Sequence, residues 1–113
     1  MKLYELSAAQ ASALIQRGEL SPVELLTAIL ERIAAIELTI QAWELLDREG
    51  ALAAARTVER AVNRGEWQPL AGVPLGVKDI FDVVGLPTVA GFAPRRNAVA
   101  TADSAAVARL RQA

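Results

Sequence analysis

Lys78 is the residue of this chain whose type and setting best suit chemistry. The chain has no histidine and no cysteine, which leaves no Ser-His-Asp or Cys-His catalytic set, no thiolate chemistry and no imidazole metal site. A base must therefore be a carboxylate, a lysine or a group supplied from elsewhere. Of the 12 lysines and arginines, only Lys2 and Lys78 are lysines. Because arginine cannot lose its proton whereas a buried lysine can become neutral, Lys78 is a candidate base.

Other interpretations of the same stretch remain open. Lys78 could simply form an ion pair with Asp79 or Asp82, and the two carboxylates could hold a metal ion or act as an acid–base pair. Two carboxylates in a turn are more typical of turn acceptors, and no third ligand is near, so we expect no metal and no cofactor. The run from Gly72 to Lys78 resembles a phosphate loop only superficially, because Asp79 stands where serine or threonine is required. Three arginines spaced four residues apart are most simply a solvated helix face; they are Arg56, Arg60 and Arg64.

Composition excludes several partners. The net charge is -1 and aromatic residues make up 4% of the chain, so neither a nucleic-acid surface nor an anionic-membrane surface is indicated. The opening residues, Met1–Glu5, lack the apolar run of a signal peptide, and a cytoplasmic protein is the default expectation. The hydrophobic fraction of 53% is high for so small a domain, which favours apolar faces that meet more protein, whether another part of a larger domain or a second copy.

Local signals predict four helices that would position these residues. Ser7 begins a capping box for a helix that ends near Arg17, and Ser21 with Pro22 begins one over residues 22–36. Asp47 caps a helix over residues 47–63, and Asp103 caps one that runs through Leu110. Two short apolar segments predict strands, Ile40–Leu46 around Trp43 and Val73–Val77.

The run Pro69–Gly91 resembles the lysine segment of the amidase-signature family. That segment reads Pro-Leu-x-Gly-(Val/Ile)-Pro-apolar-x-(Val/Ile)-Lys-Asp, then a turn with aspartate, then Gly-Leu-Pro-Thr-x-x-Gly. The remainder agrees in order: Ser21–Leu25 resembles the family's opening, Gln41–Trp43 its Asn-Ala-aromatic strand, and Asp103–Gln112 the helix that follows the lysine loop. The resemblance covers essentially all 113 residues.

This resemblance implies an α/β fold, a mixed sheet flanked by helices, of which residues 1–113 are the N-terminal segment. It implies an amidase that cleaves carboxamide C–N bonds through an acyl-enzyme, with a Ser-cisSer-Lys triad in which Lys78 is the lysine. Both serines and their Gly/Ser-rich loop lie beyond the helix at which these residues stop, so we expect the chain alone to be inactive. It also implies that one segment approaches the substrate channel: Thr88, Val89, Ala90 and Gly91.

Two functional interpretations follow. The first is an amidase fragment whose partners are a small-molecule amide and the rest of the amidase domain. The second is a non-catalytic module of amidase ancestry that packs against a partner or itself. Within the first, Ile80 after Lys78-Asp79 favours a general amidase over the tRNA-dependent amidotransferase A subunit, which usually has asparagine there.

Overall fold

The computed structural model describes residues 1–113, and the chain divides into two compact units, Met1–Pro74 and Leu75–Ala113. Along the sequence the elements are η1 (Leu3–Glu5), α1 (Ala8–Gln16), α2 (Pro22–Ile40), α3 (Arg48–Asn63), η2 (Ala93–Asn97) and α4 (Ala105–Gln112), where η denotes a 3-10 helix. The first unit contains η1 and α1 to α3, and the second contains η2 and α4.

Helix α1 begins and ends where the sequence predicts. The Ser7 N–H donates to Gln10 Oε1 at 2.9 Å and the Gln10 N–H donates to Ser7 Oγ at 3.2 Å, which is the predicted capping box. The helix stops before Gly18, whose φ of +71° lies in the left-handed region that favours glycine.

Helix α2 starts at the predicted position but is longer than predicted. Ser21 Oγ accepts from the N–H groups of Val23 and Glu24, each at 3.1 Å, and also contacts the Glu59 carboxylate of α3. Instead of stopping at residue 36, the helix continues to Ile40 and ends at Gln41, which has a φ of +53°. One further turn therefore replaces the start of the predicted strand.

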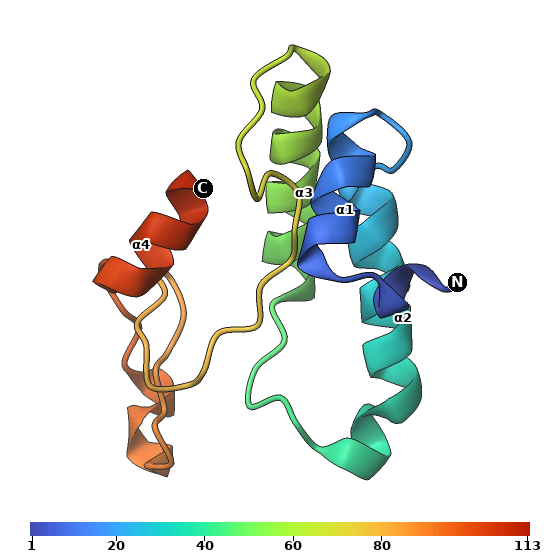
Figure 1. Cartoon of the computed structure of the whole chain (residues 1–113). Helices are drawn as coiled ribbons and strands as arrows, with labels where there is room; N and C mark the ends of the chain where they lie inside the picture. The colour runs from blue at the N-terminus through green and yellow to red at the C-terminus, as the bar shows by residue number, and fades with distance from the viewer. The chain divides into compact units, whose positions relative to one another are not determined.

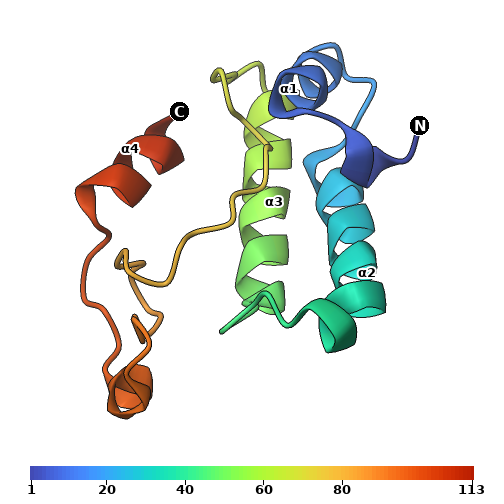
Figure 2. The same ribbon diagram turned by 60° about the horizontal axis from the view of Figure 1, so that its bottom comes forward.

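Helix α3 runs antiparallel to α2, side by side with it (Figures 1 and 2). Asp47 caps α3 as predicted, accepting from the Gly50 N–H at 3.1 Å. The helix α1 packs at the end where α2 begins and α3 ends, and this is where the core of the first unit lies. One cluster of buried residues consists of Ala11, Ile15, Leu20 and Leu25, against which Leu3, Leu6, Leu14, Ile29 and Val62 pack, and Leu26 and Leu30 of α2 are buried as well.

The chain after α3 returns along α1. Pro69 O accepts a hydrogen bond of 2.6 Å from Ser12 Oγ, which explains why this serine is buried. Gly72 has a φ of +82°, and a Cβ atom there would lie 2.7 Å from Pro22 Cγ and 3.0 Å from Ile15 Cδ1. Glycine is therefore required at this position both by the backbone and by the close approach.

The two predicted strands do not form, and the mixed sheet is not seen in this chain. The only β pairing is an isolated antiparallel bridge between Pro87 and Val99. Residues 41–46 are irregular and exposed, with the Trp43 N–H donating to Glu37 Oε1 at 2.8 Å. A strand needs a neighbour to pair with its N–H and C=O groups, and no other segment of these residues pairs with either predicted strand.

Helix α4 begins one residue later than its predicted cap implies. Ser104 is the N-cap, and its Oγ accepts from the Val107 N–H at 3.4 Å. Asp103, the predicted cap, instead accepts from the Val84 N–H at 2.8 Å and forms an ion pair of 2.8 Å with Arg111 Nε. The prediction was wrong by one position because a tertiary partner competes for the Asp103 carboxylate.

Candidate functional site

Lys78 precedes a tight turn in the second unit. Its carbonyl oxygen accepts from the N–H groups of Ile80 and Phe81, at 2.8 and 3.1 Å. Its side chain is exposed and makes no hydrogen bond or ion pair in this chain. The alternative in which Lys78 merely pairs with Asp79 or Asp82 is therefore wrong here, and its ammonium group is available to other partners.

Asp79 is a turn acceptor, as its place in the sequence indicated. Its Oδ1 accepts from the Val89 N–H at 2.9 Å and its Oδ2 from the Ala90 N–H at 3.2 Å. Its carbonyl oxygen also accepts from the Ala90 N–H, at 3.0 Å. The residue next to Lys78 therefore binds the segment predicted to approach the substrate channel.

Thr88 is held by side chains on either side of it in sequence. Thr88 Oγ1 donates to Asp82 Oδ1 at 2.6 Å, and its carbonyl oxygen accepts from Arg95 Nε at 3.1 Å. Thr88 and Val89 are buried, whereas Ala90 and Gly91 are exposed. The structure thus brings the four predicted channel residues to the turn that carries Lys78.

The acidic side chains near Lys78 already accept hydrogen bonds from other groups. No group of three or more aspartate or glutamate side chains could hold a metal ion, and Asp79 and Asp82 are each engaged with backbone or hydroxyl donors. The sequence interpretation missed Arg95 and the Asp79 bonds. A turn acceptor ten or more residues from its donors leaves no local pattern, so only the folded loop shows it.

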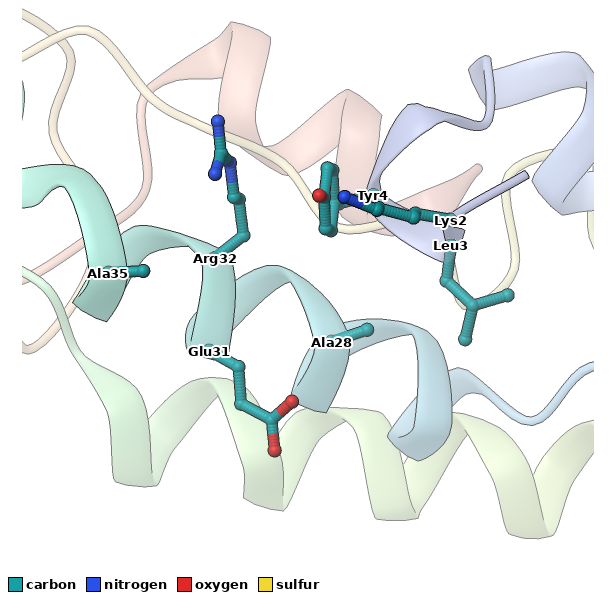
Figure 3. Close-up of a pocket in the computed structure, with 7 residues that line it drawn as sticks. All are labelled: Lys2, Leu3, Tyr4, Ala28, Glu31, Arg32 and Ala35. Carbon is teal, nitrogen blue, oxygen red and sulfur yellow. The ribbon is translucent and has the colours of Figure 1, made fainter.

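A separate hollow of about 330 Å³ lies in the first unit, between η1 and α2. In it the Tyr4 ring lies between two cations, with Lys2 Nζ 5.6 Å and Arg32 Cζ 5.1 Å from the ring centroid (Figure 3). The pKa of Lys2 is raised, first by its interaction with the Tyr4 side chain and then by the charge of Glu5. These contacts fasten η1 to α2 and involve none of the predicted site residues.

Comparison with known proteins decides the family. The sequence model described as Amidase matches residues 24–113, a range that contains Lys78 and the whole loop from Asp79 to Gly91. The chain belongs to the amidase-signature family. The resemblance that the lysine segment predicted is therefore confirmed.

The relatives of this amidase-family chain include components of amidotransferases. It is 40% identical over 111 residues to the A subunit of the glutamyl-tRNA(Gln) amidotransferase of Roseiflexus castenholzii, covering 98% of this chain and 23% of that protein. It is 44% identical over 112 residues to the same subunit of Salinispora tropica, again over 98% of this chain and 23% of the relative. The chain thus spans about a quarter of the length of the curated relatives it matches.

A solved structure also matches the amidase-family chain. It comes from a vestigial protein complex described in connection with the evolutionary origins of an s-triazine catabolic enzyme. The match has a TM-score of 0.88 and 32% identity, and covers 95% of this chain and 24% of the other.

Two further expectations can be compared with these findings. The preference for a general amidase still rests on Ile80 alone, and the amidotransferase relatives give it no support. None of the helices has the length and apolar character needed to span a membrane.

Proposed function

We propose that these residues form the N-terminal segment of an amidase domain, with Lys78 as the base of a Ser-cisSer-Lys triad. The observation that carries the proposal is the position of Lys78 within the run Pro69–Gly91, inside the range 24–113 that matches the family. The serines and their Gly/Ser-rich loop are supplied by sequence outside the 113 residues. The single domain of which this is a segment contains the mixed sheet that the chain alone lacks.

The proposed chemistry transfers a proton from serine to lysine. Neutral Lys78 accepts the proton of the bridging serine, which accepts that of the nucleophilic serine. The nucleophile forms an ester with the acyl group, the C–N bond breaks, and the amine or ammonia leaves with a proton. Water then hydrolyses the ester. Burial disfavours the charged form of a lysine and can make it neutral near pH 7, so we expect the exposed Lys78 to be covered in the complete domain.

Exposed apolar side chains indicate that this segment packs against more protein. The end of α2 and the residues after it present a run of apolar groups to solvent: Leu38, Ile40, Trp43, Leu45 and Leu46, which are between 37% and 92% exposed. Such a cluster is unusual on a small stand-alone protein and typical of a surface that meets more protein. We expect the rest of the amidase domain to cover it, with residues 40–46 and 73–77 pairing in the sheet.

A fusion protein tests the proposal. Residues 1–113 are fused to the part of the Salinispora tropica amidotransferase A subunit that follows its aligned segment, and hydrolysis of glutamine and of simple aryl amides is measured. We expect activity from the fusion and none from the 113 residues alone. Lys78→Ala and Lys78→Arg should each lower kcat by about 10²- to 10⁴-fold, because arginine keeps the charge but not the neutral form.

Lys2→Ala is the matched control for the lysine substitutions, since it removes the other lysine from a hollow that contains none of the predicted site residues. It should leave the rate unchanged. Near-normal activity in Lys78→Arg would make the lysine an electrostatic group and not a base. Turnover by the 113 residues alone that disappears in Lys78→Ala would require a nucleophile among them.

The second candidate is a non-catalytic module of amidase ancestry. It is favoured by the same exposed apolar run and by the exposed Lys78 side chain. Size-exclusion chromatography of the chain separates the two. The amidase segment should associate irregularly through its uncovered apolar surface, whereas a module should form one defined oligomer or monomer while the fusion stays inactive.

A further inference from the structure

Resting on the proposed function, we infer that Asp79 is a positioning residue that fixes the backbone of Val89 and Ala90 beside Lys78. Asp79 follows Lys78 directly, and its two carboxylate oxygens accept from two successive N–H groups at 2.9 and 3.2 Å. The peptide that carries Lys78 and the predicted wall of the substrate channel are thus joined through one side chain.

The carboxylate of Asp79 is directed at these backbone donors alone. No lysine or arginine forms an ion pair with it, so its negative charge is not used for a salt bridge. Hydrogen bonds from N–H groups to an ionised acceptor are roughly twice as strong as neutral ones. Bonds of this kind to the N–H groups of Val89 and Ala90 fix the orientation of two successive peptide groups, Thr88–Val89 and Val89–Ala90.

The conformation of Ala90 shows what the bonds maintain. Ala90 has a φ of +51°, in the left-handed region, where a residue with a Cβ atom is disfavoured. Gly91 follows with a φ of +75°. Strained residues of this kind persist only when their surroundings hold them, and they are concentrated at functional sites. Asp79 supplies that restraint, through its side chain and its carbonyl oxygen, at the exposed end of the segment.

Amide hydrogen exchange of the 113-residue chain tests, without any catalytic assay, whether Asp79 holds Val89 and Ala90 in place. Asp79→Asn keeps one acceptor oxygen but places an NH₂ group against the other donor. Exchange at Val89 should rise roughly 10- to 100-fold, and exchange at Ala90 should rise less, because the Asp79 carbonyl oxygen still accepts from the Ala90 N–H. Asp82→Asn is the matched control: it makes the same charge change in the same turn and keeps the oxygen that Thr88 Oγ1 needs. If exchange at both amides is no faster in Asp79→Asn than in Asp82→Asn, the inference is wrong.

The fusion enzyme tests the consequence for catalysis. Asp79→Asn should lower kcat there by roughly 10-fold or more, while Asp82→Asn has the smaller effect. Adding Ala90→Gly to Asp79→Asn should recover roughly 5-fold, because glycine adopts the left-handed conformation without the Cβ penalty. A residue whose loss acted through another part of the fold would not be rescued in this way.

The outcomes separate this inference from the proposed function. An inactive wild-type fusion counts against the proposed function, and the exchange measurement still decides whether Asp79 holds the segment. An active fusion whose rate is unchanged by Asp79→Asn overturns the positioning role, even though the amidase assignment stands.

Discussion

The two units of the chain are each stabilised by different forces. In Met1–Pro74, three capped helices bury apolar side chains such as Ile15 and Leu30, each 1% exposed. In Leu75–Ala113 only three residues are buried, Thr88, Val89 and Val107, and the loop is held by carboxylates that accept from backbone N–H groups. Helical periodicity therefore suffices to build the first unit, whereas the second depends on a few polar side chains at particular positions.

This contrast matters because the candidate site, the turn of Lys78 and the segment that Asp79 binds, lies in the second unit. A loop fixed by directed hydrogen bonds can hold a strained residue such as Ala90, which a regular helix would not accommodate. Few interactions stabilise this loop, however, so single substitutions there should open the loop locally and leave the helices intact.

The largest effect is expected from Ile15→Ala in the first unit. Removing a side chain that is 1% exposed leaves a cavity, and the free energy of unfolding should fall by roughly 2–5 kcal/mol. Urea unfolding followed by far-UV circular dichroism measures it. Leu38→Ala is the control, because that side chain is 92% exposed and should change stability by less than about 0.5 kcal/mol. Equal losses would mean that the helices do not depend on this core.

A smaller effect is expected from Gly72→Ala, compared with Gly18→Ala. Both glycines have positive φ values, +82° and +71°, but only at Gly72 would a Cβ meet neighbours, with Pro22 Cγ 2.7 Å away. Gly18→Ala should destabilise by roughly 1 kcal/mol and Gly72→Ala by roughly 2–4 kcal/mol, since overpacking adds to the backbone strain. Thermal unfolding of the two variants gives the difference, and equal values would show that residues 69–74 do not pack against α1.

The smallest effect on the whole chain is expected from Asp103→Ala in the second unit. It leaves the Val84 N–H and Arg111 without their acceptor, so about 1–3 kcal/mol of local stability should be lost. Hydrogen exchange should accelerate at Val84 and stay unchanged in α1 to α3. Asp103→Asn keeps an acceptor for Val84 and should lie between the wild type and Asp103→Ala. Faster exchange throughout the first unit would show that the two units unfold together.

Helix positions could be predicted well because their signals are local. Ser7, Ser21 and Asp47 each sit next to an apolar periodic run, and the structure uses all three as caps. The errors depend on tertiary structure. Asp103 is diverted from its helix by Val84 and Arg111, and α2 runs on through residues where a strand was predicted. For Asp103 the deciding partners are distant in sequence, and for residues 40–46 no strand within these residues pairs with them; neither fact can be predicted from a local pattern.

The family, the candidate base Lys78 and the three helices of the first unit could be predicted before the structure was known. These depend on residue types and short spacings, which a chain carries whether or not it is folded. The folded loop was needed to show that Asp79 and Asp82 bind the segment from Thr88 to Ala90, and that Ala90 has a left-handed conformation. A hydrogen bond between residues ten positions apart forms only when the intervening chain closes into a loop. That closure depends on the whole loop and on no single motif.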